Sequence, residues 1–89
     1  MIKSYKSIAS DGAETWFTNR LKYHRIDGPA YIGASGLYKA WYFDGKRHRL
    51  DGPAIERAVG QNQWWIDGKK IDCSSQEEFK RIMKLKAFW

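Results

Sequence analysis

Two histidines offer the most obvious potential for chemistry in this sequence of 89 residues. His24 and His48 are each followed closely by an aspartate, Asp27 and Asp51. A histidine oriented by a carboxylate is a common general base, but an enzyme needs one such pair in an asymmetric pocket. Here the arrangement is duplicated, which favours a structural role in which each imidazole packs on tryptophan and bonds to a turn backbone. We therefore predict no catalytic residues and no enzymatic activity.

Metal and phosphate chemistry have little support in the sequence. Cys73 is the single cysteine, and with two widely separated histidines it gives no spacing typical of metal ligands. The glycine-containing segment 33–36 lies between expected strands, whereas a phosphate-binding loop precedes a helix. No metal site and no cofactor are predicted.

Cations interleaved with aromatic residues are stronger evidence for a binding site than the metal or phosphate patterns. In two expected hairpins Tyr42 faces Arg47 and Trp65 faces Lys70, while lysines recur beside the turns. Aromatic rings beside cations suit a ligand with bases and phosphates, since stacking contributes ~1–3 kcal/mol per base and the cations neutralise phosphate. The predicted ligand-binding residues are Tyr42, Arg47, Trp65, Lys70, Lys46 and Lys69.

The overall charge is compatible with this interpretation. Sixteen Lys and Arg against ten Asp and Glu give a formal charge of +6, which attracts nucleotides, nucleic acid, acidic proteins or acidic membrane surfaces. The alternative is that the cations form ordinary cross-strand pairs on a solvated sheet face, each contributing about 0.2–1 kcal/mol. Both interpretations remain open at this stage.

The residues named so far belong to a repeated unit. His24–Ala30 reads His-Arg-Ile-Asp-Gly-Pro-Ala and recurs at His48–Ala54 with Leu in place of Ile. Trp41–Lys46 reads Trp-Tyr-Phe-Asp-Gly-Lys and recurs as Trp-Trp-Ile-Asp-Gly-Lys at Trp64–Lys69. A fixed period of this size indicates a repeat architecture.

Turn chemistry predicts that each unit is a β-hairpin. Asp44-Gly45 and Asp67-Gly68 are typical of two-residue type I′ turns, in which both residues have positive φ. In the first unit we expect a three-residue loop at 19–21, flanked by Thr18 and Lys22. This register places the first tryptophan of each unit on one face, the expected core. It places Tyr42 and Trp65 on the opposite face, the expected binding face. The expected core pairs are Trp16 with His24, Trp41 with His48, and Trp64 with Ile71.

The predicted fold is mainly β: an antiparallel meander of β-hairpin repeats with one C-terminal α-helix, in a single domain over residues 1–89. Residues 1–13 are expected to form an N-terminal capping strand, and residues 14–72 about two and a half hairpin repeats. Ser75 with Glu78 forms a capping box that predicts a helix over 75–86. The apolar tail 87–89 is expected to dock back or to meet a partner. So small a core also favours a homodimer.

Localisation follows from what the sequence lacks. It has no initial apolar segment and no run of the ~20 apolar residues that cross a bilayer. A lone cysteine suits a reducing compartment. We expect a soluble, cytoplasmic protein that does not bind membranes.

The unit Trp-x-x-Asp-Gly-Lys-x-His-Arg-x-Asp-Gly-Pro-Ala, complete at Trp41–Ala54, resembles that of small repeat proteins of bacteriophages and large viruses. These look like distant relatives of MORN repeats, which are stacked β-hairpins. The likeness covers Trp16 to about Asp72, with departures at the 19–21 loop and at Ile71-Asp72, where His-Arg belongs. The resemblance implies a viral, non-catalytic module, and many small phage proteins act against host defences.

Together these observations predict a non-enzymatic, phage-type counter-defence protein in the host cytoplasm. It would sequester an anionic nucleotide, such as an immune signalling nucleotide, on its basic, aromatic sheet face. Three alternatives stay open: a protein-binding inhibitor of a host defence protein, a non-specific nucleic-acid-binding accessory protein, and a purely structural viral accessory protein.

Overall fold

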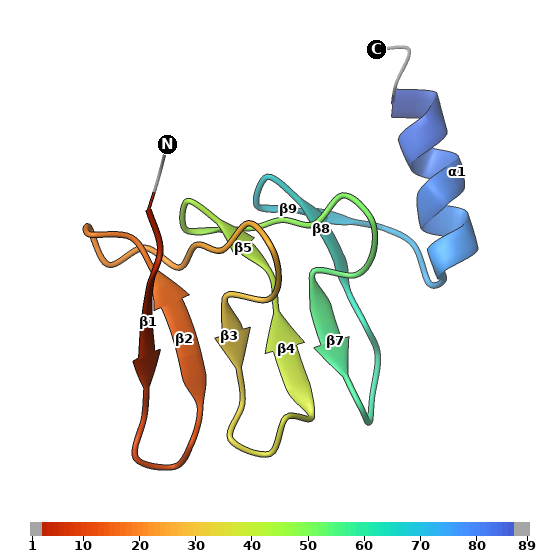
Figure 1. Cartoon of the computed structure of the whole chain (residues 1–89). Coiled ribbons are helices and arrows are strands. Elements are labelled where there is room, and N and C mark those ends of the chain that lie inside the picture. The colour runs from red at the N-terminus through yellow and green to blue at the C-terminus, as the bar shows by residue number, and fades with distance from the viewer. Residues whose placement is uncertain (1–2, 87–89) are drawn as a thin grey trace.

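Short antiparallel strands form most of the molecule, and the computed structural model describes residues 3–86 (Figure 1). One five-stranded sheet contains, in spatial order, β1 (Tyr5–Ile8), β2 (Glu14–Phe17), β3 (Tyr31–Ile32), β4 (Tyr38–Ala40) and β7 (Ile55–Arg57). Two separate hairpins pair β5 (Tyr42–Phe43) with β6 (Lys46–Arg47), and β8 (Trp64–Ile66) with β9 (Lys69–Ile71). The helix α1 (Gln76–Lys86) follows at the end of the stack. The predicted mainly β meander with a C-terminal helix is confirmed.

The turns of the hairpins have the predicted geometry. Asp44 and Gly45 have φ values of 49° and 84°, and Asp67 and Gly68 have values of 50° and 81°, as a type I′ turn requires. Tyr42 pairs with Arg47 and Trp65 with Lys70, so the predicted register is correct.

The first hairpin is built around the predicted three-residue loop at 19–21. The amide of Thr18 donates to the carbonyl of Lys22 at 2.8 Å, which closes a three-residue loop. Leu21 in that loop has a φ of 62°, a conformation that costs energy in a residue with a side chain.

Trp16 and Trp41 each make one backbone hydrogen bond toward the sheet and one toward a hairpin. The amide of Trp41 donates to Ala54 of the sheet region at 2.7 Å, and its carbonyl accepts from His48 of the hairpin at 3.0 Å. Trp16 makes the equivalent bonds to Ala30 and His24. The meander therefore divides at these residues into one sheet and separate hairpins, rather than continuing as a single ladder.

The apolar core lies at the third repeat. Trp64, Ile71 and Phe79 are buried together, because α1 packs on the β8–β9 hairpin. The indole Nε1 of Trp64 donates to Gln76 at the start of α1, at 2.8 Å.

The start of α1 is capped largely as predicted. The hydroxyl of Ser75 accepts a bond from the amide of Glu78 at 3.1 Å. The Glu78 carboxylate reaches back one residue further than expected and accepts from the amide of Ser74 at 2.7 Å.

No helix among residues 3–86 has the length and apolar character needed to cross a membrane.

The expected continuous tryptophan core is wrong for the first two repeats. His24 is fully buried, but Trp41 is only half-buried and Phe43 is 47% exposed. The physical reason is that α1 covers only the last hairpin (Figure 1). The lead strand β1 lies at the sheet edge with all four side chains exposed. The tail 87–89, expected to dock, lies outside the described residues.

Candidate ligand-binding face

The arginine of the motif His-Arg-x-Asp-Gly-Pro-Ala is fully engaged within the fold. In the second repeat the Cζ of Arg49 lies 3.9 Å from the centre of the Trp41 ring. Its Nε donates to Asp51 at 3.0 Å, and its Nη1 donates to the carbonyl of Pro53 at 3.1 Å. A Cβ built at Gly52 would lie 2.9 Å from that Cζ, so glycine is what leaves room for the guanidinium.

The first repeat holds its arginine in the same way. The Cζ of Arg25 lies 3.8 Å from the centre of the Trp16 ring, and its Nε donates to Asp27 at 3.0 Å. The hydrogen bond from Arg25 lowers the pKa of the Asp27 carboxyl below its ordinary value, helped by backbone bonding and by the charge of Arg25. The recurrence of Trp, Arg, Asp and Gly in the unit thus reflects one structural clamp.

The two histidines connect neighbouring repeats. The Nδ1 of His24 accepts a bond from the amide of Asp44 at 2.8 Å, and the Nδ1 of His48 accepts from the amide of Asp67 at 2.9 Å. Each imidazole therefore binds the turn of the next hairpin. His24 is fully buried, and its Nε2 has no hydrogen-bond partner in the described residues. This geometry gives His24 no path to a ligand.

Arg47 differs from the two clamped arginines. Its Cζ lies 4.8 Å from the centre of the Trp65 ring, and its Nε donates to the hydroxyl of Tyr42 at 3.3 Å. Among residues 3–86, no carboxylate lies within ion-pair distance of Arg47. Lys70 is exposed and lies opposite Trp65 in the β8–β9 ladder. The structure thus brings together four predicted residues, here named the binding face: Tyr42, Arg47, Trp65 and Lys70.

The structure does not bring Lys46 and Lys69 to this face. Lys46 pairs with Phe43, and Lys69 pairs with Ile66. Because side chains alternate along a strand, these lysines point to the side opposite Arg47 and Lys70. The lysines beside the turns, here named the lysine ladder, are Lys22, Lys46 and Lys69. They were predicted to lie next to the aromatic residues because strand alternation was not applied to the positions next to each turn.

The lysine ladder itself is present as a structural feature. Carbon atoms of the Lys22 side chain lie 3.4 Å from a Cβ built at Gly45, and those of Lys46 lie 3.5 Å from one built at Gly68. Each lysine stem therefore packs over the turn of the next repeat. The Nζ of Lys46 also lies 3.6 Å from the carboxylate of Asp67.

A tyrosine pocket adjoins the binding face and was not predicted. Tyr23, Tyr31, Tyr38 and Tyr42 line a hollow of about 280 Å³ together with Ala40. The Tyr23 ring lies 5.1 Å from that of Tyr42 and 6.5 Å from that of Tyr31, centre to centre. Tyr42 belongs to both sites, so aromatic surface continues from the pocket to Arg47. The pocket could have been predicted from the pairing of Tyr31 with Ala40. That pairing depends on the geometry of the turn at 33–36, which the residues of the turn do not reveal.

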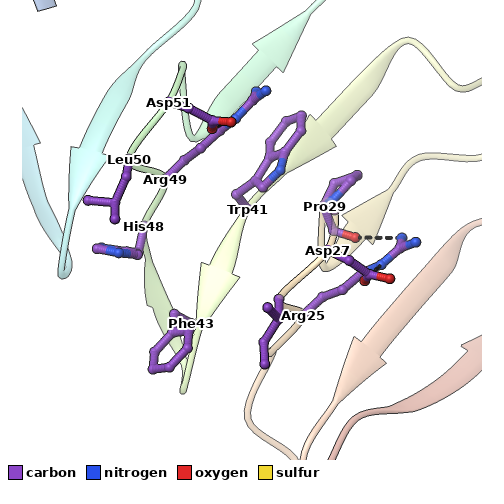
Figure 2. A pocket seen from close by; sticks show the side chains of 11 residues that line it. Arg25, Asp27, Pro29, Trp41, Phe43, His48, Arg49, Leu50 and Asp51 are labelled. Carbon is purple, nitrogen blue, oxygen red and sulfur yellow. Dashed lines mark hydrogen bonds and ion pairs between the residues drawn. The ribbon is translucent and has the colours of Figure 1, made fainter. Parts of the chain in front are cut away.

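The opposite side of the hairpins carries a second hollow, which Figure 2 shows from close by. This groove, of about 760 Å³, runs between the two His-Arg-x-Asp-Gly-Pro loops. Trp41 lies between them, with Pro29 and Asp27 to one side and Arg49 and Asp51 to the other. Sequence reasoning missed this groove because it assigned Trp41 to the core.

In residues 3–86, no three His, Cys, Asp or Glu side chains are grouped so that they could hold a metal ion. Comparisons with protein-family models, with curated proteins and with solved structures found no match to this chain.

Proposed function

We propose that this chain is a non-enzymatic binding protein that captures an anionic nucleotide on the binding face. The observation that carries the proposal is the state of Arg47. Arg25 and Arg49 each bind a carboxylate and a backbone carbonyl within the fold, whereas the one side-chain hydrogen bond of Arg47 within residues 3–86 runs from its Nε to Tyr42. A guanidinium that is positioned but has no carboxylate in the described chain is suited to bind an external anion.

The surroundings of Arg47 favour a ligand that combines phosphate with a planar ring. Trp65 and Tyr42 hold the guanidinium in place, so less rotamer entropy is lost when phosphate binds. Lys70 adds a second cation on the same side. The tyrosine pocket next to Tyr42 offers aromatic surface on which a base can stack.

The biological role that we propose comes from the resemblance of the repeated unit to phage and large-virus proteins with MORN-like hairpins. In that setting the captured ligand is an immune signalling nucleotide of the host, and the protein acts by holding it away from its receptor in the host cytoplasm. No bond is made or broken, so the two histidines need no catalytic role.

The test is to purify the full chain from host cells at moderate salt, denature it, and analyse the supernatant for nucleotides by mass spectrometry. We expect a stoichiometric nucleotide from the wild type and none from Arg47→Glu. Arg81→Glu, which makes the same charge change on the exposed surface of α1, is the matched control and should retain the nucleotide. An empty wild-type supernatant, with one acidic host polypeptide retained instead, would favour the protein-binding inhibitor.

The lysine ladder supports a second candidate, non-specific binding of nucleic acid. Each lysine stem packs over the turn of the next repeat. The ladder therefore places one positive charge per repeat along one side of the molecule. Such binding depends on counterion release, so the affinity for a random oligonucleotide should fall steeply with salt. It should also fall with Lys22→Glu and be insensitive to Trp65→Leu, which would separate it from nucleotide capture.

A further inference from the structure

Within residues 3–86, the first two repeats lack a second layer of structure. The molecule measures 42 × 33 × 17 Å, so it is thin in one direction. A β-sheet normally buries one face against another layer, and α1 supplies this only for the β8–β9 hairpin. Of the eight buried hydrophobic residues in the described chain, four are alanines: Ala13, Ala30, Ala40 and Ala54. Little large apolar surface is therefore buried outside the third repeat.

The exposed area of the chain agrees with a missing partner. The accessible surface is 6355 Å², for a mass of 10.4 kDa. A compact monomer of that mass exposes roughly 5,400 Å². The excess, about 950 Å², is in keeping with the thin shape of the molecule.

The Trp41 groove gathers three exposed apolar side chains around a half-buried tryptophan. Ile26 and Leu50 occupy equivalent positions on the two loops that flank the groove, and they are 70% and 63% exposed. Phe43, at 47% exposure, lines the hollow with Trp41. An apolar patch of this kind, on a chain with so little core, marks an interaction surface.

Charge indicates what kind of partner fits. The two arginines that line the groove are each paired with an aspartate of the same chain, Arg25 with Asp27 and Arg49 with Asp51. The two loops are therefore nearly neutral on a molecule of net charge +6. Lys46, which shares this side of its hairpin with Phe43, lies 3.6 Å from the carboxylate of Asp67. An acidic partner gains little here, whereas a second copy of this basic chain meets no uncompensated like charge on these loops.

We propose that the Trp41 groove is the interface between two copies of this chain. The two copies are related by a two-fold axis, and the apolar side chain of Leu50 from each copy lies over Trp41 and Phe43 of the other. The groove and its rim belong to the same surface, as a self-complementary two-fold interface requires. Because Arg47 points to the opposite side of the hairpin, the binding faces of both copies stay open to solvent. The proposal does not depend on the ligand.

The experiment is sedimentation equilibrium of the purified full chain over a dilution series, with Leu50→Asp and Leu37→Asp as variants. Leu37 is a matched control because it is also an exposed leucine, at 58%, but it lies outside the groove. Far-UV circular dichroism and thermal melting establish that each variant is folded, which both exposed positions should allow. A second groove variant, Ile26→Asp, tests the equivalent position of the first repeat.

The wild type and Leu37→Asp are expected to reach twice the mass of one chain. Leu50→Asp should raise the dimer dissociation constant at least about tenfold while remaining folded. A wild type that keeps the mass of one chain at every concentration would overturn the proposal. So would a dimer that Leu50→Asp and Ile26→Asp leave intact, or one that Leu37→Asp weakens to the same extent.

Discussion

The imidazole of His48 accepts a hydrogen bond from the backbone amide of Asp67 at 2.9 Å, and this bond joins the second repeat to the third. His24 makes the equivalent bond to Asp44 at 2.8 Å. The relationship also explains why Ile71 stands where the third unit should have histidine. After that hairpin the chain continues into α1 instead of another Asp-Gly turn, so no amide is there to be bound, and Ile71 is buried against Phe79 instead.

Replacing His24 should therefore weaken the stack of repeats. In His24→Leu the amide of Asp44 loses its acceptor, and such a loss costs about 1–3 kcal/mol at a buried site. Chemical denaturation monitored by tryptophan fluorescence measures the change in the free energy of unfolding. His48→Leu is the internal control, because its bond lies nearer solvent and water can replace the acceptor. Equal losses for both variants would contradict this reasoning.

The clamp around Arg49 predicts a specific coupling with Gly52. In Gly52→Ala the new methyl group would displace the guanidinium from Trp41 and Asp51, so we expect a destabilisation of about 1–2 kcal/mol. In the background of Arg49→Ala the same glycine substitution should cost little, because nothing remains to be displaced. A double-mutant cycle of thermal melts gives the coupling energy. Additive effects would show that glycine is needed for its backbone rather than for the arginine.

The environment of Cys73 predicts a thiol that is alkylated slowly. Partial burial raises the pKa of the Cys73 thiol above its ordinary value, and the charges of Glu78 and Asp72 raise it further. A raised pKa leaves less thiolate at neutral pH, so alkylation by iodoacetamide should be slower in the folded chain than in urea. Asp72→Asn should speed the folded reaction modestly. A folded rate equal to the rate in urea, across pH 7–9, would rule out this effect of the environment.

Local features of the fold were predictable because short-range chemistry determines them. Asp44-Gly45 fixed both the turn type and the pairing of Tyr42 with Arg47, and the register then followed along the hairpin. The three-residue loop before Lys22 followed from a one-residue difference in spacing between the repeats. Ser75 gave the start of α1 in the same way.

Features that depend on distant packing were not predictable. Whether Trp41 is core or groove depends on how far α1 extends over the hairpins, and the sequence does not encode this locally. The tyrosine pocket requires strands β3 and β4 to place Tyr31 and Tyr38 beside Tyr42, which depends on the course of the chain through Trp41. The placement of Lys46 could have been predicted, because strand alternation alone separates it from Arg47.

The most direct test of the central claim is to measure ligand retention and melting temperature together in the double variant Arg47→Glu/Lys70→Glu. The control Arg81→Glu/Lys84→Glu makes the same charge change on exposed residues of α1. We predict that the binding-face variant loses the nucleotide released by denaturation, while its melting temperature stays within a few degrees of the control. A binding-face variant that keeps the nucleotide, or that no longer folds, would contradict the assignment of these residues to a ligand site.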